Sequence, residues 1–124
     1  MINQPYEKLA NIDSNNFQNK SVLIIGSGYI ALEYVKALKK LKIKNIEILS
    51  KSENSLDNKV LSEYKIIFGG FGKKINLIEK KDLTIIATPI NLLVKAATLA
   101  IKSGQENILI EKPGSLFKTD LILL

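Results

Sequence analysis

Cysteine, histidine, arginine and tryptophan are all absent from this chain of 124 residues. Without cysteine the chain can form no disulfide and offers no thiolate nucleophile or ligand, and such a composition suits a reducing compartment. Without histidine it lacks the commonest general acid–base group and the commonest metal ligand, so we expect no metal site. Any chemistry must therefore use lysine, tyrosine or carboxylates, or groups supplied from elsewhere.

The missing arginine also bears on how the positive charge is interpreted. All 18 basic residues are lysines, and the formal net charge is +6. Lysine cannot make the bidentate contacts with bases and phosphates that arginine makes. The densest lysine cluster, in residues 36–44, falls on the polar face and end of a predicted helix. A solvated face is the favoured interpretation, a nucleic-acid surface the alternative, and we expect no nucleic-acid partner.

Long apolar runs are lacking too. No run approaches the roughly 20 residues of a membrane span, and the first residues do not resemble a secretory signal. We therefore expect no membrane partner and a cytoplasmic location. Residues 1–19 are interpreted as a polar extension with at most a short helical turn, and residues 20–124 as one domain.

The most informative segment runs from an apolar strand through glycines into a helix. Residues 22–25 form a continuous apolar run of the kind found in buried parallel strands. Gly26 permits a tight turn, and Gly28 lets a pyrophosphate approach the backbone. Ala31 is small where the helix meets the strand, and residues 29–41 carry apolar side chains at helical spacing. This pattern predicts a dinucleotide site at a helix amino terminus.

Strands and helices alternate along the chain. The predicted strands are residues 22–25, 45–49, 83–87 and 107–110, and the predicted helices are residues 29–41 and 91–102, the second capped by Asn91 and stopped by Gly104. In the less legible middle, residues 56–64 are a candidate helix, 65–68 or 75–78 the third strand, and 69–72 a loop. The alternation predicts an α/β fold, a Rossmann-type doubly wound parallel sheet.

Ligands of such sheets bind beyond the carboxyl ends of the strands, at the point where the strand order reverses. Four strand ends carry polar or conformationally special residues. At the second, Ser50, Lys51 and Ser52 stand where an NAD site usually has an acidic residue, and Glu47 lies three residues too early. Hydroxyls and a cation suit a 2′-phosphate, so the sequence favours NADP, with NAD as the alternative. The predicted cofactor-binding residues are Gly26, Ser27, Gly28, Tyr29, Ile30, Ser50, Lys51, Ser52, Ala87, Thr88, Pro89, Glu111 and Lys112.

Three segments resemble one family. Residues 26–31 (Gly-Ser-Gly-Tyr-Ile-Ala), 82–89 (ending Ala-Thr-Pro) and 110–114 (Ile-Glu-Lys-Pro-Gly) are similar to the amino-terminal domain of the glucose-fructose oxidoreductase and inositol dehydrogenase family, Gfo/Idh/MocA. The resemblance implies hydride transfer at a nicotinamide on a sugar, nucleotide sugar or polyol. It also implies that Lys112 is the catalytic lysine and often precedes a cis-proline, and that Thr88-Pro89 lines the nicotinamide ribose.

The chain departs from this family in two respects. The family's second domain, which holds the substrate and supplies a histidine, is not in this sequence, and Leu93 stands where another family histidine is common. We expect a chain truncated at its carboxyl terminus, unable to turn over a small sugar-like substrate alone. Residues 117–124 begin a helix whose apolar residues 121–124 would be exposed, so we expect a homo-oligomer or a partner chain to cover them.

Simpler interpretations stay open at this point. Lys51 could be a solvated loop lysine, Lys112 a strand-end lysine bonded to loop carbonyls, and Thr88-Pro89 only the stop of a strand. A non-catalytic dinucleotide-binding module or redox-responsive subunit would share the pyrophosphate site and differ at Lys112, and a degenerate domain would bind nothing.

Overall fold

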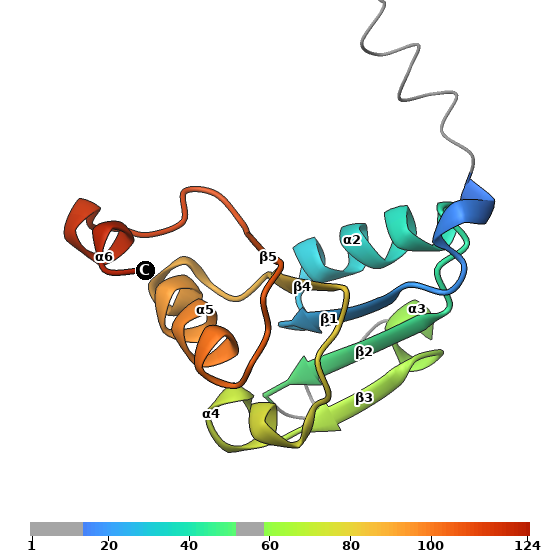
Figure 1. The fold of residues 1–124 in the computed structure, drawn as a ribbon, viewed down its shortest axis with the longest axis horizontal. Helices are drawn as coiled ribbons and strands as arrows, with labels where there is room; N and C mark the ends of the chain where they lie inside the picture. Colours follow the sequence, from blue (N-terminus) through green and yellow to red (C-terminus); the bar gives the residue numbers. More distant parts are fainter. Residues whose placement is uncertain (1–13, 52–58) are drawn as a thin grey trace, which may run out of the picture.

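Five strands form one entirely parallel sheet in the computed structural model, which describes residues 14–51 and 59–124. The spatial order is β3-β2-β1-β4-β5, so the chain reverses direction across the sheet between β1 and β4 (Figure 1). This order confirms the predicted doubly wound Rossmann-type fold and places its switch point beside the glycine turn. The strands are β1 (Ser21–Ile25), β2 (Asn45–Ser50), β3 (Lys65–Phe68), β4 (Leu83–Ile86) and β5 (Ile108–Ile110).

Helices cover both faces of the sheet. One cluster of buried apolar side chains packs under α2 (Tyr29–Lys40) and α3 (Lys59–Ser62) on one face of the sheet. A second such cluster packs under α4 (Phe71–Lys74) and α5 (Leu93–Lys102) on the other face (Figure 1). The helical elements are η1 (Ser14–Phe17), α2 (Tyr29–Lys40), α3 (Lys59–Ser62), α4 (Phe71–Lys74), η3 (Ile75–Leu77), η4 (Ile90–Leu92), α5 (Leu93–Lys102) and α6 (Lys118–Ile122). Phe17 of η1, inside the predicted polar extension, packs against the cluster under α2.

The central strand explains why the sheet needs both layers. Val22 and Ile24 belong to the cluster under α2, whereas Leu23 and Ile25 belong to the cluster under α5. All four side chains are at most 1% exposed. Burying each contributes about 1.5–3 kcal/mol relative to exposure, so a continuous apolar run is stable only between two layers of helices.

The structure decides between the alternatives for the middle of the sequence, residues 56–78. Residues 65–68 form the third strand. In the competing segment, residues 75–78, a 3-10 turn covers Ile75–Leu77, and Ile75 and Ile78 are buried under the sheet. The predicted loop at residues 69–72 is wrong in its second half, because α4 begins at Phe71. Of the candidate helix at residues 56–64, only Lys59–Ser62 is helical in the part that the structure describes.

The predicted amino-terminal cap of α5, Asn91, is also wrong. Asn91 is exposed and lies within η4, and α5 begins two residues later with Leu92 at its cap position and no side-chain cap bond. The cause is local: Pro89 starts a tight turn in which the Leu92 N–H donates to the Pro89 carbonyl over 2.9 Å. This turn displaces the helix start from the asparagine.

Polar groups at the amino ends of the strands form their own cluster. The Glu47 carboxylate lies 3.0 Å from the Lys65 ammonium and 3.3 Å from that of Lys81, which is only 7% exposed. Burial acts to raise the pKa of Glu47, but these two lysines outweigh it and hold that pKa below its ordinary value. Gln105, 2% exposed, accepts hydrogen bonds from the Lys81 N–H and the Thr84 hydroxyl. Glu47 is thereby held away from the carboxyl ends.

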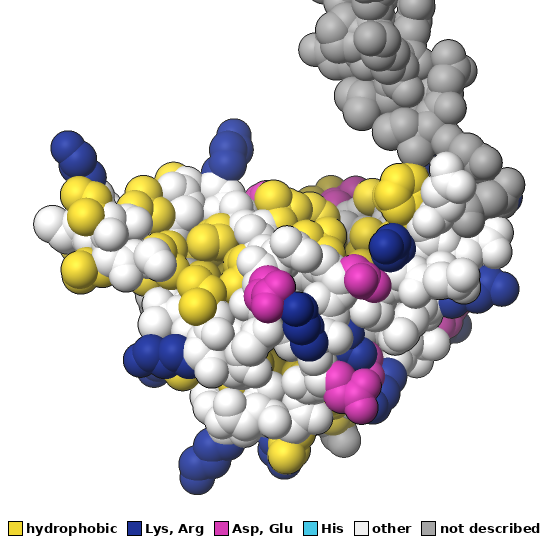
Figure 2. All heavy atoms as spheres, in the orientation of Figure 1, with side chains coloured by type: hydrophobic (Ala, Val, Ile, Leu, Met, Phe, Trp, Pro, Cys, Tyr) yellow, Lys and Arg dark blue, Asp and Glu magenta, His cyan; other side chains and the backbone are white. Residues whose placement is uncertain are grey.

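The last helix leaves apolar side chains in solvent. α6 projects beyond α5 in Figure 1, and Figure 2 shows hydrophobic side chains gathered over that end of the molecule. Ile122 is 71% exposed and Leu123 84%. The exposure agrees with the sequence-based expectation, and the homo-oligomer or partner chain expected to cover this end stays a prediction.

Candidate functional site

The turn after β1 requires glycine at its first position. The Gly26 N–H donates to the Leu49 carbonyl over 2.9 Å, which ties the turn to β2. Gly26 has φ +118°, a conformation that residues with a side chain rarely adopt. A Cβ there would lie 2.4 Å from the carbonyl oxygen of Ala87. The turn is thus wedged between the ends of β2 and β4, at the switch point of the sheet.

The second glycine leaves an open cradle instead. Gly28 is the cap residue of α2 with φ −83°, and a Cβ there would meet nothing within 4 Å. No side chain caps this helix end, and no acidic residue stands in its first turn. The first N–H groups of a 12-residue helix therefore face accessible space beside a residue without a side chain. A pyrophosphate fits this arrangement in shape and in charge.

Two serines join the glycine turn to the end of β2. The Ser27 and Ser50 hydroxyl oxygens are 2.7 Å apart, and Ser50 is fully buried. The sequence places Ser50 at the cofactor ribose, and that contact stays a prediction; in the structure the Ser50 hydroxyl contacts that of Ser27 in the glycine turn. Ser50 therefore fixes Ser27 and the backbone around it, and Lys51 is the exposed residue at this strand end.

A cavity of about 520 Å³ opens at the carboxyl ends of the strands. It brings together five of the predicted residues: Gly26, Ser27, Lys51, Thr88 and Pro89. Gly28 and the exposed Tyr29 and Ile30 begin α2 directly after this turn, and Ala87 supplies the carbonyl against which Gly26 packs. Ser52 lies outside the described residues. Three of the four predicted strand ends thus meet in one cavity.

Sequence reasoning missed the other half of the lining, which comprises Leu49, Gly69, Gly70, Phe71, Gly72, Leu92 and Lys95. Four of these follow β3, and the parallel pairing of β3 with β2 brings them to the cavity, where the Gly70 N–H donates to the Ser50 carbonyl over 2.9 Å. The glycine-rich segment itself was a signal, but it pointed to a site only once residues 65–68 were known to be the third strand. Lys95 carried no signal, because it looked like any exposed helix lysine.

The fourth predicted strand end, after β5, lies apart from this cavity. Glu111 lines a smaller hollow of about 270 Å³ together with Ile30 and Tyr34 of α2. The Tyr34 hydroxyl donates to the Glu111 carboxylate over 2.7 Å. Lys112 is exposed and follows directly, and its peptide bond to Pro113 is cis. The Tyr34–Glu111 bond therefore attaches the segment that carries Lys112 to the helix that begins at the glycine turn.

This bond predicts a pH-dependent contribution to stability. Burial, with the hydrogen bond and negative charge of Glu111, raises the pKa of Tyr34 from 10.0 to about 12. A raised pKa means that the bond stabilises the fold fully below pH 10 and that this stabilisation is lost as the pH rises through 12. Tyr34→Phe should lower the free energy of unfolding by about 1–2 kcal/mol at pH 8, with a difference from wild type that shrinks above pH 10 and vanishes only above pH 12. Urea unfolding of both proteins at a series of pH values measures this.

Tyr29→Phe is the matched control, since this side chain is 73% exposed and should contribute nothing measurable at any pH. A cost of Tyr34→Phe that stays constant from pH 8 to pH 12 would contradict the assignment.

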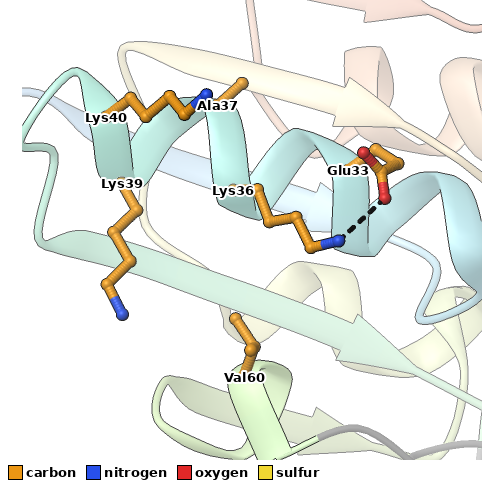
Figure 3. A pocket seen from close by; sticks show the side chains of 6 residues that line it. All are labelled: Glu33, Lys36, Ala37, Lys39, Lys40 and Val60. Atoms are coloured by element: carbon orange, nitrogen blue, oxygen red, sulfur yellow. Dashed lines mark hydrogen bonds and ion pairs between the residues drawn. The ribbon is translucent and has the colours of Figure 1, made fainter.

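The lysines of the outer α2 surface line a different hollow. A hollow of about 540 Å³ is lined by Lys36, Lys39 and Lys40 of α2 together with Val60. Figure 3 shows these side chains, with Lys36 turned toward Glu33 on the same helix. Lys36 lies 3.0 Å from the Glu33 carboxylate, and Lys39 lies 3.4 Å from that of Glu63. All four of these ion-paired side chains are about half exposed or more, and such pairs contribute little. This surface matches the predicted solvated face, and it lies away from the glycine turn.

The fold and the turn define the chain as a Rossmann-type α/β domain. In sequence it is similar to a protein named shikimate dehydrogenase (NADP(+)) from Prochlorococcus marinus, 34% identical over 97 residues, which are 74% of this chain and 34% of that protein. A second strain has a protein of the same name that is 33% identical over 95 residues. The chain spans about one third of the length of these curated relatives. No family model matches the chain.

Solved structures share the fold at lower identity. An NAD-binding protein from Listeria innocua superposes with a TM-score of 0.67 at 20% identity, over 84% of this chain and 30% of that one. Biliverdin reductase from Synechocystis, solved with biliverdin and NADP+, gives 0.65 at 22% identity, over 81% and 31%. The WlbA dehydrogenase from Bordetella pertussis, solved with NADH and UDP-GlcNAcA, gives 0.65 at 18%, over 82% and 32%. These likenesses establish the fold.

None of the described helices has the length and apolar character needed to cross a membrane. Residues 14–51 and 59–124 bring together no group of three acidic side chains that could hold a metal ion.

Proposed function

We propose that this chain is the dinucleotide-binding domain of an NADP-dependent oxidoreductase. The observation that carries the proposal is the pair of glycines at the switch point of the sheet. Gly26 makes a turn that no other residue could make without displacing Ala87, and Gly28 leaves the start of α2 open. A turn that served only to reverse the chain would not need a second residue without a side chain at the helix cap.

The preference for NADP rests on the end of β2. Lys51 is exposed there and lines the cavity, and Glu47, the acidic residue of β2, is held by two lysines at the other end of the sheet. A site for the ribose 2′-hydroxyl of NAD usually has a carboxylate at this strand end, and a 2′-phosphate prefers a cation. The names of both sequence relatives specify NADP(+), which supports the same choice.

The chain's own residues have separate tasks in this proposal. The first N–H groups of α2 hold the pyrophosphate, and the Ser27–Ser50 contact keeps the turn in place. NADP, when bound, supplies or accepts the hydride. Lys112 is the catalytic lysine that orients the substrate hydroxyl, as the family resemblance implies, and Tyr34 holds the neighbouring Glu111.

The substrate is chosen by residues outside the cavity described here. The Gfo/Idh/MocA resemblance points to a sugar, nucleotide sugar or polyol, while the sequence relatives are named for shikimate. In both cases the substrate is a hydroxylated ring or chain, and turnover requires groups beyond those of this chain, which has no histidine.

Calorimetric titration of the purified chain with NADP and with NAD tests the proposal. We expect NADP to bind and to raise the unfolding temperature, since a ligand at 100 times its Kd stabilises the folded state by about 2.7 kcal/mol. NAD should bind more weakly. No heat and no change in unfolding temperature with either dinucleotide at millimolar concentration would refute the function.

A further inference from the structure

The cavity at the strand ends has a defined position relative to the switch point. Leu49, which lines it, belongs to the core cluster on the α4 and α5 face, and Phe71, which also lines it, packs against that cluster. Gly69 and Gly70 extend it past the end of β3, the outermost strand on that side. The cavity therefore extends from the glycine turn over the ends of β2 and β3, and its wall on the β4 and α5 side consists of Thr88, Pro89, Leu92 and Lys95. A dinucleotide whose pyrophosphate crosses the glycine turn would place one of its two nucleoside halves there.

The positions of the predicted nicotinamide-side residues in the sheet indicate which nucleoside half lies over β2 and β3. Of the predicted nicotinamide-side residues, Glu111 and Lys112 follow β5 at the opposite edge of the sheet and do not line this cavity, whereas Thr88 and Pro89 line its β4 side. The half that lies over β2 and β3 is thus the adenosine half. In NADP it differs from NAD by one group, the 2′-phosphate on the adenosine ribose.

Two lysines from different elements line this cavity. Lys51 follows β2, and Lys95 comes from the first turn of α5, so their side chains reach the same space from separate walls. None of the described residues lining the cavity carries a carboxylate. A cavity with two ammonium groups and no acidic side chain favours a dianion over a neutral ribose, because each cation adds a charge-assisted hydrogen bond.

We propose that Lys95 is a specificity-determining residue that, with Lys51, binds the 2′-phosphate of NADP from the α5 side of the cavity. This inference rests on the proposed function and goes one step beyond it. A pyrophosphate contact is the competing role for Lys95. The pyrophosphate sits against Gly26 and Gly28 at the start of α2, and α2 packs on the other face of the sheet from α5. Lys95 therefore approaches the ligand on the face opposite α2.

The test compares Lys95→Ala and Lys51→Ala with wild type in calorimetric titrations against NADP, NAD, adenosine 2′,5′-bisphosphate and 5′-AMP. Lys95→Ala should weaken NADP about tenfold, as expected for one charge-assisted contact, and leave the affinity for NAD within twofold. Adenosine 2′,5′-bisphosphate should weaken in parallel with NADP, and 5′-AMP should not change. The double variant should bind NADP and NAD almost equally.

Lys102→Ala is the matched control, because Lys102 is an exposed lysine of the same helix that does not line the cavity. It should bind all four ligands as wild type does, which separates a local contact from the loss of one positive charge. An equal loss for NADP and NAD in Lys95→Ala would assign Lys95 to the pyrophosphate or the adenine and overturn the inference. So would unchanged NADP affinity. A wild-type chain that binds neither dinucleotide would instead refute the proposed function itself.

Discussion

Replacing Gly28 with alanine should weaken NADP binding about a hundredfold while leaving the stability of the free chain within about 1 kcal/mol of wild type. The position is open in the structure: an added Cβ meets nothing within 4 Å, and φ is −83°, which alanine adopts readily. Alanine is a poorer cap residue than glycine, but it also lowers the entropy of the unfolded chain, and the two effects nearly offset each other. The bound pyrophosphate, however, needs the space that the new methyl group occupies.

Calorimetry and urea unfolding of Gly28→Ala and Gly28→Val together check this result. If the side chain acts by filling the cradle, the loss of NADP affinity grows from alanine to valine while the free chain still unfolds cooperatively. Wild-type affinity in Gly28→Val would mean that the cofactor does not cross the turn, whatever else it binds.

Part of the fold and of the candidate site could be predicted from the sequence. The apolar run before Gly26 and the helical spacing after Ala31 fixed the strand, turn and helix, because a buried strand and an amphipathic helix leave strong and different periodicities. The alternation of strands and helices along the chain then predicted the four strand ends at which the site residues lie. Five of the residues that the sequence placed at the ends of the first, second and fourth strands meet in one cavity: Gly26, Ser27, Lys51, Thr88 and Pro89.

The rest of the fold and of the site could not be predicted from the sequence, because it depends on tertiary packing. Residues 65–68 and 75–78 are both short runs that contain apolar residues, and only packing against the sheet decides that the second forms a 3-10 turn (Ile75–Leu77) with Ile75 and Ile78 buried. The sequence predicted Ser50 as a ligand contact from its place at a strand end, but it could not show that the Ser50 side chain is fully buried and bonds Ser27. Lys95 was one of 18 lysines until the fold placed it on the cavity wall.

Gly26→Ala should affect folding rather than binding alone. The substitution forces a Cβ to within 2.4 Å of the Ala87 carbonyl oxygen, at a residue whose φ is +118°. The backbone conformation alone costs on the order of 1–3 kcal/mol for a residue with a side chain. Relief of the overlap must also push apart the ends of β1 and β4, where the Ala87 N–H donates to the Ile25 carbonyl over 2.8 Å. We expect a total loss of about 3–5 kcal/mol, a large part of the 5–15 kcal/mol that holds a small domain folded.

Gly104→Ala separates these two contributions. Gly104 also has a positive φ, +102°, but a Cβ there would meet nothing within 4 Å, so its substitution carries the conformational cost without the overlap. Urea unfolding followed by far-ultraviolet circular dichroism should rank wild type first, Gly104→Ala lower by about 1–2 kcal/mol, and Gly26→Ala lowest or unfolded without denaturant. Equal losses in the two variants would mean that the strand ends can move apart freely. The glycine turn would then be a flexible connection, and the fixed phosphate cradle on which the proposed function depends would be lost with it.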